Sequence, residues 1–154
     1  MKIHFALTGF MGSGKTTIGK IIAQKSNVPF IDLDEYIEQR ENKTINEIFL
    51  NGENYFRALE TRYLKEILET PQSTVIALGG GTVCFNNNLQ LIRQHAWLIA
   101  LLPEITILTE RLWKEKDKRP LLKNITSKDE LAAFIEKKLK ERMPFYMQAD
   151  WIVS

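Results

Sequence analysis

The chain has 154 residues, 44% of them hydrophobic, which is enough for one compact domain with a real core. Its 21 lysines and arginines nearly balance its 19 acidic residues, so nucleic acid and anionic membranes are not expected as partners. The apolar run before Thr8-Gly9 is too short for a secretory signal, and no stretch approaches the ~18 apolar residues of a membrane span. Cys84 is the one cysteine, so no disulfide can form within the chain. We expect a soluble, cytoplasmic protein that is a monomer.

Apolar runs alternate with amphipathic segments along the chain, a pattern typical of a parallel sheet covered by helices. The predicted strands span residues 3–8, 29–33, 73–78, 97–102 and 151–154. Capping-box spacing at Thr44 and at Ser127 predicts helix starts near 45 and 128, with Gly52 as the stop of the first. The charged stretch 113–123 is predicted to be a mobile loop.

The segment after the first predicted strand, residues 9–17, reads GFMGSGKTT and matches the phosphate-binding loop G-x-x-x-x-G-K-[ST]. Glycines let the backbone wrap around phosphates, and the amphipathic segment 15–25 is predicted to add the positive end of a helix. Lys15 is expected to reach the β and γ oxygens, and the Thr16 hydroxyl to ligate Mg²⁺. The motif predicts a nucleoside triphosphate with one Mg²⁺, bound by Gly12, Ser13, Gly14, Lys15, Thr16 and Thr17.

Two carboxylates, Asp32 and Asp34, stand at the end of the second predicted strand. On an extended chain this spacing sends both to the same side. Because the carboxyl ends of parallel strands line the ligand crevice, both could face Mg²⁺ and the phosphates. The alternative for Asp34 is a cap on the following helix.

Two observations narrow the use of the nucleotide. The pair Asn42-Lys43 lacks the aspartate of a guanine-reading motif, which disfavours a GTPase. The apolar strand 73–78 runs into the triple glycine 79–81 rather than into a carboxylate that would orient water, which disfavours motor and transport ATPases. Three glycines let a ligand approach free backbone N–H groups, although a tight turn would use them equally well.

The chain resembles the shikimate kinases in the order and rough spacing of six segments. These are Gly9–Thr17, Asp32–Asp34, Glu53–Glu60, Gly79–Gly81, Lys118–Leu122 and Glu141-Arg142-x-x-x-Tyr146. The resemblance spans nearly the whole chain. It implies a single α/β P-loop kinase domain over residues 1–154 with the nucleoside-monophosphate-kinase fold. In that fold a three-layer α/β/α sandwich surrounds a five-stranded parallel sheet of order 2-3-1-4-5. A substrate-binding helical segment at about 34–60 and a lid at about 113–124 complete the fold.

The resemblance also implies the activity, which is transfer of the γ-phosphoryl of ATP to the 3-hydroxyl of shikimate in aromatic amino-acid biosynthesis. By resemblance, Thr16 and Asp32 hold Mg²⁺, and Lys15, Asp34 and Arg119 are catalytic. Shikimate and ATP are then the small-molecule partners.

The remaining roles concern binding and are again implied by the resemblance. Arg57 and Arg142 grip the substrate carboxylate, and Asp34 accepts hydrogen bonds from the ring hydroxyls. The backbone of the triple glycine, Gly79, Gly80 and Gly81, lies against the substrate. Arg111 lies beside the adenine, while Arg119 moves in from the lid onto the phosphates.

Two departures from the family pattern stand out. Ala77 lies where some members carry a hydroxyl, and members generally continue beyond the last strand through an adenine-contacting loop and a helix, whereas this sequence ends at Ser154. His4 and His95 match no metal-ligand spacing and are expected to be structural. Two alternatives stay open, namely another small-molecule kinase of this fold, such as a gluconate or nucleoside monophosphate kinase, and a nucleotide-binding protein without catalysis.

Overall fold

A five-stranded parallel sheet forms the centre of the computed structural model, which describes residues 2–154. Its strands are β1 (His4–Gly9), β2 (Phe30–Asp32), β3 (Val75–Ala77), β4 (Ala96–Leu101) and β5 (Trp151–Val153). They lie side by side in the order β2-β3-β1-β4-β5, and every neighbouring pair is parallel. The predicted strand order is confirmed.

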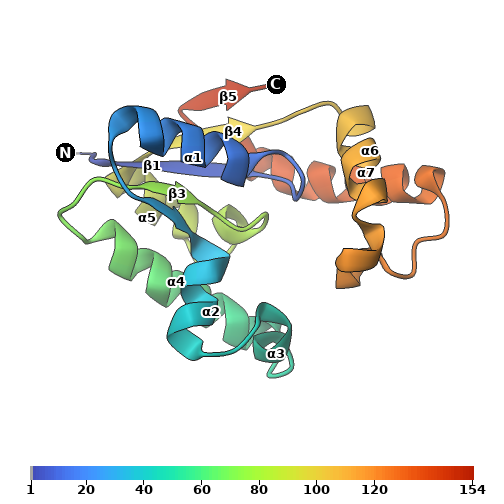
Figure 1. The fold of residues 1–154 in the computed structure, drawn as a ribbon, viewed down its shortest axis with the longest axis horizontal. Helices are drawn as coiled ribbons and strands as arrows, with labels where there is room; N and C mark the ends of the chain where they lie inside the picture. The colour runs from blue at the N-terminus through green and yellow to red at the C-terminus, as the bar shows by residue number, and fades with distance from the viewer. Residues whose placement is uncertain (1) are drawn as a thin grey trace.

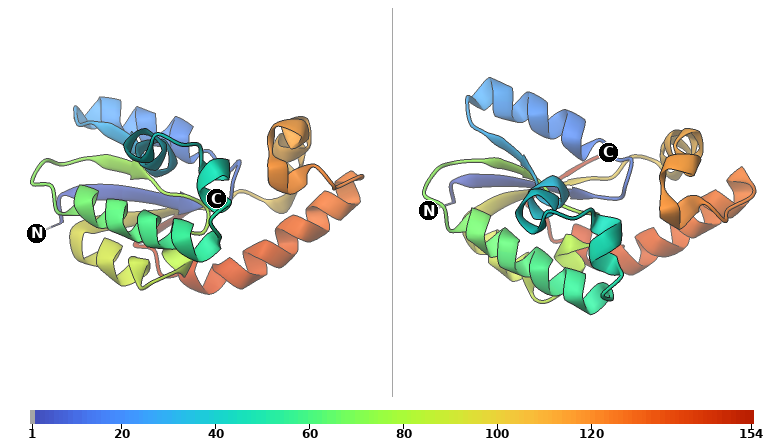
Figure 2. Two further views of the ribbon diagram at one scale, coloured as in Figure 1. Left: turned by 90° about the horizontal axis from the view of Figure 1, so that it is seen from below. Right: turned by 60° about the horizontal axis from the view of Figure 1, so that its bottom comes forward.

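Helices cover both faces of this sheet, which makes the predicted three layers. They are α1 (Lys15–Ser26), α2 (Leu33–Glu41), α3 (Ile45–Phe49), α4 (Glu53–Leu68), α5 (Asn88–His95), α6 (Ile105–Lys114) and α7 (Lys128–Tyr146). In Figure 1, α2 and α3 lie beside α4 at the bottom of the view, and α6 lies against α7 at one end of the sheet. Figure 2 shows α1 above the sheet and α4, α5 and α7 below it.

The inner strands are apolar because both of their faces are covered. All three residues of β3 are buried, as are Ala6 and Leu7 of β1, whereas the edge strand β5 is exposed along its length. Buried side chains from α4 and α7 extend the same core below the sheet. The sheet therefore holds the carboxyl ends of β1, β2 and β3 in fixed relative positions, and the loops that carry the motifs follow from those ends.

Two sequence predictions about where elements end need correction. The second strand ends at Asp32 rather than Leu33, because the Asp32 side chain accepts a hydrogen bond from the Glu35 N–H and begins α2. Thr44 makes the full predicted capping box with Glu47. However, α3 ends at Phe49, so Gly52 is not its stop but the residue before α4, at φ 101°.

Ser127 caps α7 as predicted by accepting from the Glu130 N–H. The Glu130 carboxylate turns back to Thr126 instead, accepting from its N–H at 3.1 Å and its hydroxyl at 2.9 Å. The stretch 113–123 starts inside α6 and continues through two 3₁₀ turns, Lys116–Lys118 and Pro120–Leu122. Across residues 2–154, the structure contains no helix long and apolar enough to cross a membrane.

Candidate active site

The phosphate-binding loop connects β1 to α1 and owes its shape to three glycines. Gly9, Gly12 and Gly14 have φ angles of 148°, 80° and 102°, which other residues rarely adopt. A Cβ on Gly9 would also lie 2.6 Å from the Leu101 carbonyl oxygen. Because Gly14 offers no side-chain cap, the first N–H groups of α1 remain available to an anion.

A cavity of about 570 Å³ opens along this loop. Most of the residues predicted for the site line it, and these are Gly12, Ser13, Gly14, Lys15, Thr16, Thr17, Asp32, Asp34, Gly79, Gly80, Arg111 and Arg119. Met11, Ile18, Ala77, Leu78 and Glu115 complete the lining. The other three predicted residues, Arg57, Gly81 and Arg142, lie next to it and not in its wall. The fold thus brings together segments that are far apart in the sequence.

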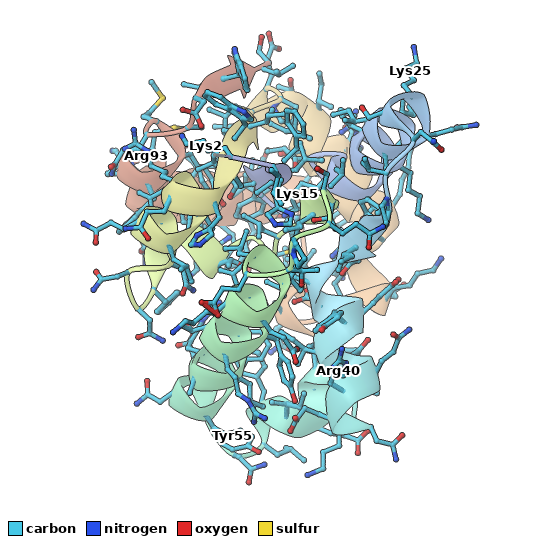
Figure 3. All side chains as sticks on the ribbon, turned by 90° about the vertical axis from the view of Figure 1, so that its left-hand side faces the viewer. Lys2, Lys15, Lys25, Arg40, Tyr55 and Arg93 are labelled. Carbon is cyan, nitrogen blue, oxygen red and sulfur yellow. The ribbon has the colours of Figure 1, made fainter. Side chains whose placement is uncertain are left out.

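Lys15 lies inside this cavity, where its ammonium group donates a 2.6 Å hydrogen bond to the Gly9 carbonyl. Figure 3 shows Lys15 in the middle of the molecule and Lys25, from the same helix, projecting outwards. Desolvation lowers the pKa of Lys15 to about 8, against the opposing effect of the nearby Asp34 carboxylate. The side chain therefore still carries most of its charge at pH 7.

The two aspartates share the cavity but do different work. Asp32 is the helix cap, and its other carboxylate oxygen accepts from the Thr16 hydroxyl at 3.4 Å. Asp34 follows in the first turn of α2, so the pair lies on one side of the site through a helix start and not, as predicted, through an extended strand. Desolvation, and then the charges of Asp32 and Glu60, raise the pKa of Asp34 to about 6.

Arg57 and Arg142 approach the triple glycine from two different helices. A Cβ on Gly80 would lie 3.0 Å from Nη1 of Arg142, and one on Gly81 would lie 3.0 Å from Nη2 of Arg57. The Arg57 guanidinium also lies 4.0 Å from the centre of the Phe85 ring. Two planar cations therefore flank one short stretch of backbone, an arrangement suited to a carboxylate.

Buried and exposed acidic residues hold the arginines of the site. Arg57 donates to the fully buried Glu60 at 2.9 Å and pairs with the exposed Glu53 at 3.3 Å. Arg119 donates twice to Glu115, at 3.0 and 2.7 Å. These ion pairs occupy guanidinium N–H donors that are predicted to bind the substrate carboxylate, in Arg57, and the phosphates, in Arg119.

Comparison with known proteins identifies the family. The shikimate kinase family model matches residues 11–154. This chain belongs to the shikimate kinase family. A shikimate kinase from Bacteroides thetaiotaomicron is 44% identical over 153 residues, which cover 99% of this chain and 86% of that protein. The family, the fold and the kinase activity predicted from the resemblance are thereby confirmed.

Two solved structures agree with this family assignment. That of the shikimate kinase from B. thetaiotaomicron matches with a TM-score of 0.91, covering 97% of this chain and 85% of that one, at 44% identity. The shikimate kinase from Acinetobacter baumannii in complex with shikimate matches with a TM-score of 0.86 at 30% identity, covering 100% of this chain and 84% of that one.

Several contacts of this site are absent from the sequence-based predictions. Glu60 lies within a segment shared with the family but has no predicted role, and Glu115 is not among the predicted site residues. Their spacing from the arginines, three and four residues along a helix, was the available signal. The hydrogen bond from Arg111 to the Gly12 carbonyl, at 2.9 Å and 99 residues apart, has no such signal. Within residues 2–154 neither histidine belongs to a metal-binding cluster.

Proposed function

We propose that this chain transfers the γ-phosphoryl of ATP to the 3-hydroxyl of shikimate, giving shikimate 3-phosphate and ADP. One observation carries the proposal. A single cavity joins a phosphate-binding loop to a half-buried carboxylate, Asp34, and two guanidiniums lie beside its glycine wall. A triphosphate on the loop and a hydroxy acid at the other end would then bring the γ-phosphoryl and a hydroxyl together. Cytoplasmic location and a monomeric state belong to the same proposal.

Asp34 is the proposed base and orienting group for the acceptor hydroxyl. Its pKa of about 6, against an ordinary value of 3.8, leaves it ionised at pH 7 to 8 but makes it a stronger base than an exposed aspartate. Phosphoryl transfer depends mainly on alignment and charge neutralisation, so holding the hydroxyl in line is the larger part of this role. The Lys15 ammonium group, whose charge interacts with that of Asp34, would bind the β- and γ-phosphate oxygens of ATP.

The residues present fit a magnesium ion. Thr16 and Asp32 offer a hydroxyl and a carboxylate 3.4 Å apart in the cavity wall, and Mg²⁺ prefers oxygen ligands with phosphates and water completing its shell. Bound there with ATP, the ion would neutralise negative charge on the β and γ oxygens. Asp32 remains free to act in this way because one of its oxygens caps α2 and the other faces Thr16.

The substrate carboxylate is assigned to Arg57 and Arg142. Both guanidiniums lie against glycines, whose lack of a side chain leaves room for them, and planar guanidiniums bind carboxylates with paired hydrogen bonds. Gly79, Gly80 and Gly81 would present backbone N–H groups to the same molecule. Arg119, which now pairs with Glu115, would turn to the phosphates when the segment 113–124 closes, and Arg111 would lie beside the adenine.

A coupled assay of ADP release tests the proposal against its alternatives. With Mg·ATP present, shikimate should stimulate ADP release steeply, and gluconate or AMP hardly at all. Equal stimulation by gluconate or AMP would assign the site to another kinase of this fold. No stimulation by any acceptor would support a nucleotide-binding protein without catalysis.

A further inference from the structure

The triple glycine reflects the little space for a side chain at Gly80 and Gly81, and not unusual backbone φ angles. None of Gly79, Gly80 and Gly81 has a positive φ, so other residues could adopt their conformations. A Cβ would instead crowd Arg142 at Gly80 and Arg57 at Gly81, at 3.0 Å in each case. The glycines let the two guanidiniums come close to the backbone.

The glycines that allow this close approach also make the loop flexible. Glycine has the greatest backbone freedom of any residue, so three in succession can rotate their peptide planes at small cost. Among residues 2–154, the N–H groups of Gly79, Gly80 and Gly81 donate to no acceptor within the protein. A loop that presents free N–H groups to a ligand binds well only if its carbonyls are held.

Each of the three carbonyls does have a donor, but only one of these donors comes from outside the loop. The Gly79 and Gly81 carbonyls accept from the N–H groups of Thr82 and Cys84, at 3.3 and 2.9 Å. The Gly80 carbonyl accepts from the Tyr146 hydroxyl at 2.5 Å, across 66 residues of sequence. Within the described residues, Tyr146 is the one side chain that ties these carbonyls to the rest of the fold.

Tyr146 is built into the molecule as a rigid support. It is the last residue of α7 and its side chain is fully buried. Burial raises the pKa of its hydroxyl to about 12, against the opposing effect of the Arg142 guanidinium, so the hydroxyl remains a donor at neutral pH. Arg142 lies four residues earlier on the same helix and therefore on the same face. One helix face contacts Gly80 twice, through the carbonyl and through the space above its Cα.

We propose that Tyr146 is a positioning residue for the acceptor substrate, which acts by fixing the Gly80 carbonyl and so the orientation of the Gly80–Gly81 peptide. In a trans peptide the C=O and the N–H point in opposite directions, so a carbonyl held on Tyr146 turns the Gly81 N–H away from α7. The same hydrogen bond sets the distance between the loop and Arg142. The inference rests on the proposed function, because it assumes that the acceptor binds at this loop.

The test is Tyr146→Phe, which keeps the buried ring and removes only the donor. Loss of one positioning contact that serves ground state and transition state alike should raise KM for shikimate about fivefold and leave kcat and KM for ATP within about twofold. Replacing Tyr146 by p-aminophenylalanine, which restores a donor at the same ring position, should recover most of the lost affinity. Unchanged KM for shikimate in Tyr146→Phe would overturn the proposal.

The matched control is Tyr63→Phe, which removes the hydroxyl of another buried tyrosine, one that donates to Glu41 and does not line the cavity. Its thermal midpoint should fall by a similar amount while KM for shikimate stays unchanged. If both variants raise KM for shikimate alike, or if Tyr146→Phe raises KM for both substrates in parallel, the effect is one of general stability and the proposal is wrong. If the wild-type protein fails to phosphorylate shikimate, the proposed function fails instead.

A measurement on the wild-type protein keeps the inference falsifiable should Tyr146→Phe fail to fold. By NMR, the Tyr146 hydroxyl proton should exchange slowly with water, and the Gly81 amide signal should shift on addition of shikimate. A rapidly exchanging hydroxyl proton, or an unaffected Gly81 amide, would overturn the proposal without any variant.

Discussion

The two ends of the cavity are built on different principles. The phosphate end is one continuous segment, Gly9–Thr17, whose backbone makes the site and whose shape depends on glycines at positive φ. The acceptor end is assembled from side chains of α2, α4 and α7 around the triple glycine, and one of them, Arg57, pairs with the buried Glu60. The first end depends on local backbone geometry, whereas the second depends on the tertiary structure.

This contrast predicts how variants at each end behave. Removing a polar side chain that lines the phosphate end, such as Lys15, should cost activity and little stability, whereas Phe10 of the same loop belongs to the core. A change at the acceptor end should alter both, because buried charges there lose their partners. The predictions below follow this contrast from the largest expected effect on turnover to the smallest.

Lys15→Ala should have the largest effect. Removing one positive charge that acts on the transferred phosphoryl should lower kcat about a thousandfold, the scale of a lost transition-state contact. The thermal midpoint should hardly change, because the ammonium group has only the Gly9 carbonyl as a partner. Lys25→Ala, an exposed lysine of the same helix, is the control and should match the wild type. Wild-type turnover in folded Lys15→Ala would remove this residue from the site.

Asp34→Asn should lower kcat about a hundredfold, because the amide can orient the acceptor hydroxyl but cannot take its proton. Steady-state kinetics at saturating shikimate and ATP measure the effect. Glu35→Gln, the exposed neighbouring carboxylate, serves as the control. An Asn variant with full turnover would reduce Asp34 to a structural role.

The same variant should be more stable than the wild type at neutral pH. The folded-state pKa of Asp34 is raised to about 6 from 3.8, so ionisation opposes folding above that range. Asp34→Asn should therefore gain about 1–3 kcal/mol at pH 7.5, and the gain should vanish as the pH falls from 6 towards 4. Urea unfolding at several pH values measures it. A gain that persists at pH 4 would contradict the assigned cause.

Arg57→Ala and Arg142→Ala should each weaken shikimate binding by about 1.5–3 kcal/mol and leave ATP affinity nearly unchanged. They should differ in stability. Arg57→Ala leaves the buried Glu60 with Thr82 as its remaining partner, which should cost about 3 kcal/mol of unfolding free energy. Adding Glu60→Gln to Arg57→Ala should recover stability but not binding. Calorimetric titration and urea unfolding separate the two effects, and a fall in ATP affinity would make the carboxylate assignment wrong.

The same contrast explains what could be predicted from the sequence. The phosphate-binding loop lies in nine consecutive residues, so its motif predicted the loop, the helix after it and the part of the cavity lining that the loop supplies, residues 12–17. The strand order followed from the family resemblance, because periodicity alone does not order parallel strands. The shared side of Asp32 and Asp34 was predicted correctly, but from a strand that in fact ends at Asp32, where its side chain caps α2.

At the acceptor end the sequence carried far less. Taken by themselves, Arg57 and Arg142 look like surface residues, and only the resemblance singled them out. Nothing in the spacing shows that Tyr146 bonds to the Gly80 carbonyl, because that contact depends on how α7 packs beneath the sheet. The ion pairs of Arg57 and Arg119 could have been predicted from their spacing along a helix. Whether the acidic partner is buried or exposed could not, because that depends on the tertiary structure. Glu60 is fully buried and Glu115 is not.

The smallest predicted effect compares one exposed carboxylate at each end. Glu53 pairs with Arg57 and Glu115 with Arg119, and both acids are about half exposed, so each pair is worth about 0–1 kcal/mol. Because each acid occupies a guanidinium that a substrate would need, Glu53→Gln should lower KM for shikimate and Glu115→Gln should lower KM for ATP, each by at most about threefold. Neither variant should alter KM for the other substrate.

Glu66→Gln, which breaks an exposed pair with Arg40 away from the cavity, is the control for both. Initial rates at low ionic strength, where such pairs are least screened, give the test its greatest sensitivity. If Glu115→Gln instead raised KM for ATP, the Glu115 carboxylate would be holding Arg119 in position for the phosphates and not competing with them.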